Sequence, residues 1–84
     1  MKIYDYYGKA NLCGSRILKA RELRKLSQSQ LSAMLQVMDV SIGQKAISRI
    51  EQGERVVADY ELLALAKVLD VSPLWLLQEE QSDV

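Results

Sequence analysis

The stretch "SIGQKAISRIEQG" at residues 41–53 gathers side chains well suited to bind another molecule. Ile47 and Ile50 have the spacing of a buried helix face, and amide, hydroxyl and cationic groups occupy the other positions. Glutamine can bond adenine N6 and N7, and arginine or lysine can reach guanine O6 and N7. The pattern favours a helix that reads base edges, with an ordinary solvated face as the alternative.

Catalysis and metal binding have little support in the composition. The chain has 84 residues, no histidine and a single cysteine, Cys13. The commonest general base is therefore missing, and no nucleophile and base can be paired from spacing alone. A lone cysteine forms neither an intramolecular disulfide nor an ordinary zinc site, so we interpret Cys13 as a small buried hydrophobic residue. We expect no enzyme, no catalytic residues, no metal and no cofactor.

Charge is unevenly distributed although the formal net charge is zero. Residues 15–55 carry eight cationic and four anionic side chains, a net +4, whereas residues 56–84 carry a net −5. Such a molecule can present its basic part to phosphates while its acidic part faces away. From charge alone, an unremarkable mixture of solvated faces remains the alternative.

The length predicts one small domain. Apolar runs are much shorter than the roughly 20 residues that span a bilayer. The N-terminal "MKIYDYYGKANLCG" has no apolar stretch of the kind found in secretory signals. We expect a cytoplasmic protein with no membrane contact, divided into an N-terminal arm (1–14), a folded domain (15–78) and a flexible tail (79–84).

Apolar residues recur mostly at intervals of three and four, which predicts an all-helical fold. The first helix is expected to begin at Ser15 as N-cap and to run to about Arg24. In "SQSQL", Ser27 and Gln30 have the capping-box spacing that starts a second helix. Its predicted inward side chains are Leu31, Leu35 and Met38.

Three further helices are predicted. Gly43 is expected to cap a helix from Gln44 to about Gln52, which ends at a left-handed Gly53. Asp59 is the expected N-cap of the fourth helix. Its expected buried stripe is Leu62, Leu65, Ala66 and Leu69. In the fifth, Ser72 is the expected cap and Pro73 the first helical residue, with Leu74 and Leu77 pointing inward.

Three segments in the right order, "LSQSQLSAML", "ISRIEQGERV" and "DYELLALAKVLDVSPLWLL", resemble the Cro and C1-repressor type of helix-turn-helix, the XRE-like family. The resemblance covers about residues 15–77. It implies a five-helix domain that binds double-stranded DNA, usually as a homodimer, with its third helix in the major groove. The side chains that would face the groove are Gln44, Lys45, Ser48 and Arg49.

The resemblance also implies a structural ion pair between Arg21 and Glu51, and a phosphate contact at Gln28 beside the second helix's N-terminus. Arg16 and Arg55 are further candidates for phosphate contacts, and exposed arginines without a role are the alternative. Two departures from the family stand out. The connection "QVMDVSIGQK" is longer than the commonest form, and Lys25 and Asp70 occupy positions that are often glycine.

The tyrosine cluster "YDYY" at residues 4–7 lies outside the resemblance and has three interpretations. It would be an arm along DNA, a patch packed on the first or fifth helix, or a dimer contact. The apolar group Trp75, Leu76 and Leu77 is a further candidate dimer interface. We predict a sequence-specific transcriptional regulator, a repressor that binds a palindromic operator as a dimer. The alternative is a protein-interaction module, such as an antitoxin or adaptor, with the same fold.

Overall fold

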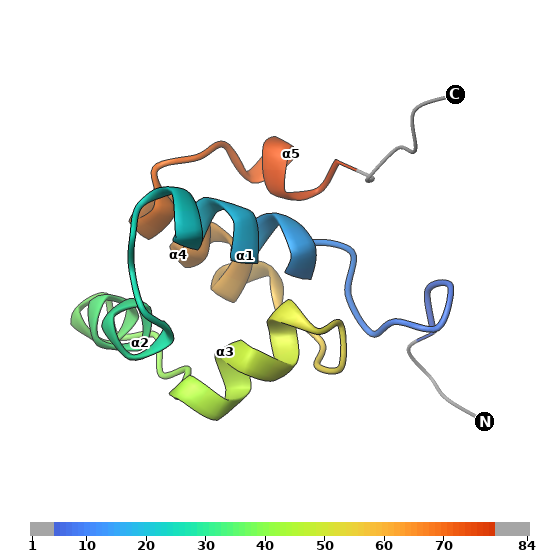
Figure 1. Ribbon diagram of the computed structural model, residues 1–84, viewed down its shortest axis with the longest axis horizontal. Helices are drawn as coiled ribbons and strands as arrows, with labels where there is room; N and C mark the ends of the chain where they lie inside the picture. The colour runs from blue at the N-terminus through green and yellow to red at the C-terminus, as the bar shows by residue number, and fades with distance from the viewer. Residues whose placement is uncertain (1–4, 79–84) are drawn as a thin grey trace.

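The computed structural model describes residues 5–78, which form five helices. They are α1 (Gly14–Leu23), α2 (Gln28–Val37), α3 (Gln44–Glu51), α4 (Asp59–Leu69) and α5 (Pro73–Leu76). Figure 1 shows α1 across the middle of the molecule, with α5 on one side and α3 on the opposite side. Helix α3 packs on α1 and α2, whereas α4 packs on α1, α2 and α5. The predicted all-helical class is confirmed.

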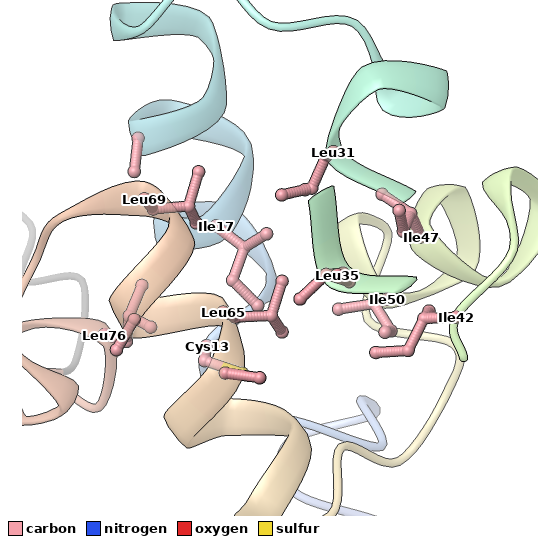
Figure 2. Packing of buried hydrophobic residues seen from close by; sticks show 13 residues of the cluster. Cys13, Ile17, Leu31, Leu35, Ile42, Ile47, Ile50, Leu65, Leu69 and Leu76 are labelled. Carbon is pink, nitrogen blue, oxygen red and sulfur yellow. The ribbon is translucent and has the colours of Figure 1, made fainter. Parts of the chain in front are cut away.

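One hydrophobic core joins all five helices, as Figure 2 shows. Eight large side chains in it are less than 2% exposed, namely Ile17, Leu31, Leu35, Ile47, Ile50, Leu65, Leu69 and Leu76. Burying a side chain of this size stabilises a fold by about 1.5–3 kcal/mol. Because Ile47 and Ile50 lie in this core, the opposite face of α3 is directed to solvent.

The predicted start of α2 is confirmed as a capping box. The Ser27 hydroxyl accepts the Gln30 N–H at 3.0 Å, and the Gln30 side-chain oxygen accepts the Ser27 N–H at 2.8 Å. Both bonds satisfy N–H groups that the helix leaves without an internal partner. The cap of α5 is also confirmed, since the Ser72 hydroxyl accepts the Trp75 N–H at 3.1 Å.

Two other predicted caps are wrong. Helix α1 begins at Gly14, two residues earlier than predicted, with Cys13 instead of Ser15 at the N-cap. Its Gly14 N–H donates to the Asn11 side-chain oxygen at 2.8 Å. Helix α4 begins at Asp59 itself, and the N–H of the preceding Ala58 donates to Glu61 at 3.0 Å. In both places a side chain three residues away accepts a backbone N–H group at the beginning of the helix.

Three predicted inward positions are also wrong. Leu76 is fully buried, whereas Leu74 is 76% exposed and Leu77 is exposed. Helix α5 has only four residues, so its sequence contains too little periodicity to identify the buried face. Met38 lies beyond the last residue of α2 and is exposed as well. On α4 the predicted stripe is buried except for Leu62, which is partly buried.

Several connections contain left-handed residues, as predicted for Gly53, with φ of 79°. The two positions that depart from the family's glycines, Lys25 and Asp70, have φ of 58° and 57°. Asp39, in the long connection between α2 and α3, has φ of 61°. Aspartate enters this region more readily than most residues with a Cβ atom, so Lys25 is the least favoured of these three residues.

Gly14, the first residue of α1, lies directly against the backbone of α3. A Cβ atom at Gly14 would overlap the carbonyl oxygen of Ile50 and lie 2.9 Å from the Asn11 side-chain oxygen. The φ of Gly14 is not left-handed, so the lack of a side chain, and not backbone freedom, is what this position requires. The end of α3 therefore rests directly on the beginning of α1.

We expect Gly14→Ala to lower the free energy of unfolding by about 1–3 kcal/mol, because the added methyl group forces the two helices apart. Urea denaturation followed by circular dichroism would measure the change. Gly43→Ala is the matched control, since a Cβ atom there has no heavy atom within 4 Å. Equal stability losses in the two variants would contradict the close contact.

Candidate nucleic-acid interface

Helix α3 presents the polar side chains that the sequence analysis singled out on one surface. Gln44, Lys45 and Arg49 are exposed, and Ser48 is half-buried. They lie on the side away from Ile47 and Ile50, which are each 1% exposed. The structure thus brings together four side chains that combine amide, ammonium, hydroxyl and guanidinium groups.

Neighbouring residues hold three of these side chains in place. The Ser29 hydroxyl of α2 donates to the Gln44 side-chain oxygen at 2.9 Å. That oxygen keeps a second lone pair, and the amide nitrogen keeps its donors, so both atoms of Gln44 can still bond a base. Gln52 donates to the Ser48 hydroxyl at 3.2 Å, and Arg49 donates to the carbonyl oxygen of Glu54 at 3.4 Å.

Glu51, at the end of α3, is bonded to side chains from two other helices. Arg21 of α1 donates through Nε to Oε2 at 2.6 Å and through Nη2 to Oε1 at 3.1 Å. Arg21 also donates to the carbonyl oxygen of Leu26 at 2.8 Å. The hydrogen bond to Glu51 raises the pKa of Arg21. The Glu51 carboxylate, with its side chain 4% exposed, thereby ties α3 to α1.

Gln28, the first residue of α2, completes the contacts of Glu51. Its amide nitrogen donates to Glu51 Oε1 at 3.0 Å. Gln28 therefore has a structural partner and retains its amide oxygen and its position at the helix N-terminus. Backbone N–H groups at such a terminus attract anions, so the surroundings of Gln28 suit a phosphate.

Arg16 lies away from this surface. Its guanidinium carbon is 4.6 Å from the centre of the Trp75 ring, a cation–π geometry. Trp75 belongs to α5, which Figure 1 places on the opposite side of α1 from α3. The structure therefore does not bring Arg16 together with the polar face of α3.

Arg55 forms an ion pair that the sequence analysis missed. It donates to both carboxylate oxygens of Glu61, at 3.0 and 3.1 Å, and to the carbonyl oxygen of Val56 at 2.9 Å. Hydrogen bonding from Arg55 lowers the pKa of Glu61 and raises that of Arg55. Spacing gave no signal, because the partners belong to a loop and to the following helix. The guanidinium of Arg55 is thus engaged within the chain.

Because the folded-state pKa of Glu61 is depressed, the unfolded chain binds more protons in acid, and stability rises with pH there. The contribution of Glu61 is fully present above the ordinary glutamate pKa and is lost as pH falls through the folded value. We expect Glu61→Gln to remove part of this dependence when urea denaturation is compared at pH 7 and pH 3. Glu54→Gln, at an exposed position, is the control for the loss of a carboxylate elsewhere.

Asn11 is a second residue that sequence reasoning missed. Its amide nitrogen donates to the carbonyl oxygens of Ile50 at 3.0 Å and Arg55 at 2.8 Å, while its oxygen accepts the Gly14 N–H. One side chain therefore satisfies backbone groups on both sides of the end of α3. The partners are 39 and 44 residues away in sequence, so no local pattern indicates them.

Cys13 is buried, and desolvation raises the pKa of its thiol to about 11. It therefore packs as a neutral hydrophobic side chain. Within residues 5–78, no group of three or more His, Cys, Asp or Glu side chains is placed to hold a metal ion. Over the same range, no helix is both long and apolar enough to cross a membrane.

Comparisons with known proteins agree with this geometry. A family model described as helix-turn-helix matches residues 17–76, and the chain belongs to this family. The resemblance to the Cro and C1-repressor type is thus confirmed. No curated protein gives a significant match.

Two solved structures are similar over most of the chain. One is the P22 c2 repressor in complex with synthetic operator 9T in the presence of Tl+, with 37% identity and a TM-score of 0.68. The match covers 83% of this chain and 98% of the repressor chain. The other is the restriction-modification controller protein C.AhdI from Aeromonas hydrophila. It has 28% identity and a TM-score of 0.66, and the match covers 75% of this chain and 88% of that one.

Proposed function

We propose that the protein is a sequence-specific DNA-binding transcriptional regulator that represses by occupying its operator. The observation that carries the proposal is the solvent-facing side of α3, where Gln44, Lys45 and Arg49 are exposed above a buried isoleucine face. The helix-turn-helix family and the likeness to a repressor solved with its operator support the same function.

Base reading is assigned to Gln44, Lys45, Ser48 and Arg49. Gln44 suits adenine, because both amide atoms can bond N6 and N7, whereas Lys45 and Arg49 suit guanine. Gln28 contacts a phosphate beside the N-terminus of α2 and so fixes the position of α3 along the groove. Arg16 and Arg55 have partners within the chain, at Trp75 and Glu61, and the proposal does not require them.

The ion pair of Arg21 and Glu51 has a structural role in this proposal. The two side chains are 13% and 4% exposed, so removing either one leaves a poorly compensated charge inside the fold. Such a loss would abolish DNA binding through the loss of structure, without any direct contact to a base. A binding experiment therefore needs a parallel measurement of folding.

We expect Arg49→Ala to lose about 1–3 kcal/mol of discrimination at one or two base pairs while keeping its helical circular dichroism. Fluorescence anisotropy with duplexes selected from a random pool would measure the loss.

Arg21→Ala should instead destabilise the fold by about 3 kcal/mol. Lys67→Ala, an exposed position on α4, is the control and should bind like the original chain. Weak binding of that original chain with no preferred sequence would contradict the proposal and favour a protein partner.

Dimerisation is the second part of the proposal. Leu76, one of the three apolar residues considered for an interface, is fully buried and belongs to the core. The exposed apolar residues nearby are Leu23, Leu74 and Leu77. Leu23 and Trp75 line the same surface pocket. Pairing of two copies through this surface would set two α3 helices about 34 Å apart, one turn of DNA, and would require a palindromic operator.

We expect Leu74→Lys to shift the protein to a monomer and to weaken binding to the palindromic site, because a charge would be buried between the two copies. Light scattering with and without the selected duplex would show the change. Val37→Lys is the matched control, since Val37 is 86% exposed on α2. A monomeric original chain under both conditions would exclude the dimer.

A further inference from the structure

A short N-terminal hairpin is attached to the end of α3. Tyr6 and Lys9 exchange backbone hydrogen bonds at 2.6 and 3.0 Å, with Tyr7 and Gly8 at the tip. The next residue, Ala10, donates to the carbonyl oxygen of Gly53 at 2.7 Å, and Gly53 lies two residues after the end of α3. Figure 1 shows this N-terminal segment projecting from the side of the molecule where α3 ends. Tyr4, the first residue of the tyrosine cluster, lies outside the described residues.

The Lys9 side chain reinforces this attachment. Its Cβ, Cγ and Cδ atoms run so close over Gly53 that an added Cβ atom there would lie 3.0–3.3 Å from them. Lys9 is nevertheless an exposed residue, in keeping with a lysine whose aliphatic stem covers a neighbour while its charged end stays hydrated. The hairpin is thus held at Gly53, two residues after the last residue of α3, and it carries a cation beside that end.

Tyr7, at the tip of the hairpin, is a residue type that this kind of turn disfavours. Tyr7 has φ of 52° and Gly8 has φ of 83°, the left-handed pair found in tight hairpins. Asparagine is the residue favoured at the position of Tyr7, and an aromatic side chain there is strained. Tyr7 is 89% exposed, although its ring lies edge-to-face with that of Tyr6, with the ring centroids 4.8 Å apart. An exposed aromatic residue retained in a strained conformation is a feature of binding sites.

The position of the hairpin matches the edge of a DNA groove. Helix α3 has eight residues and is about 12 Å long, and a recognition helix in the major groove contacts base edges with its N-terminal residues, so its other end lies farther from the bases. A segment fixed to the end of a helix that lies in the groove is therefore close to the sugar–phosphate strand bordering it. The anionic groups in this region are Asp5, whose oxygen accepts the Gly8 N–H at 2.7 Å, and Glu54.

We propose that the Tyr6–Lys9 hairpin is a separate DNA contact that binds the sugar–phosphate backbone at the edge of the groove entered by α3. The Lys9 ammonium pairs with a phosphate, and the Tyr7 hydroxyl donates a hydrogen bond to a neighbouring one. This contact rests on the proposed function, since it requires α3 to lie in the groove. It adds affinity and fixes orientation without reading bases, because backbone contacts carry no sequence information directly.

Lys9→Gln and Tyr7→Asn test the contact with the full chain and the selected duplex across a salt series. Lys9→Gln keeps the aliphatic stem over Gly53 and removes the charge. It should make the slope of log affinity against log salt shallower by about 0.9, the value for one phosphate. Tyr7→Asn should bind roughly tenfold more weakly although asparagine suits the turn better, because a hydrogen bond to a charged group is lost. Both variants should keep the base preference, and neither should lower the melting temperature.

Lys19→Gln, at an exposed position on α1, is the control for loss of a positive charge elsewhere and should keep the original slope. An unchanged slope for Lys9→Gln together with unchanged affinity for Tyr7→Asn would overturn the hairpin contact. A change in oligomeric state with an unchanged slope would overturn it too, by making the hairpin a protein contact. If the original chain shows no sequence preference, the proposed function itself is contradicted. If it shows one but the hairpin variants behave like the original chain, only the hairpin contact is contradicted.

Discussion

The carboxylate of Glu51 connects the polar face of α3 to the rest of the protein. It accepts hydrogen bonds from Arg21 of α1 and Gln28 of α2, so three helices meet at one buried anion. Because the side chain is 4% exposed, its charge is stabilised by these partners and not by water. The orientation of α3 and the position of the α2 N-terminus are thus coupled through a single side chain.

A second connection acts on backbone groups at the same end of α3. Gly14 allows α1 to touch the Ile50 carbonyl, and Asn11 bonds the carbonyl groups of Ile50 and Arg55. Contacts at its end therefore help to set the direction of α3, while Gln44 and Lys45 at its beginning remain exposed. A helix held rigidly at one end can present its side chains to a partner with little loss of conformational entropy on binding.

The basic residues of the chain divide into two groups that composition alone does not distinguish. Arg21 and Arg55 form ion pairs with Glu51 and Glu61, and Arg16 stacks on Trp75. Lys45 and Arg49 instead lie exposed on α3. The net charge of the basic segment therefore overstates the charge available to a polyanion, because part of it is neutralised inside the fold.

The sequence by itself determined the features that depend on neighbouring residues. The capping box of Ser27 and Gln30, the Ser72 cap and the isoleucine spacing of α3 each involve residues within one or two helical turns. The family resemblance extended this to the pairing of Arg21 with Glu51, because it carries information on contacts distant in sequence.

Only the tertiary structure decided how the loops and the helix ends attach to distant segments of the chain. The bonds of Asn11, the close contact at Gly14 and the attachment of Lys9 to Gly53 link segments about 40 residues apart. The buried face of α5 was likewise set by the core into which Leu76 packs. A helix of four residues carries almost no periodic signal that would identify this face from the sequence. Local physical chemistry defines the helices, whereas side-chain packing between distant segments defines how α3 and the hairpin beside it are presented.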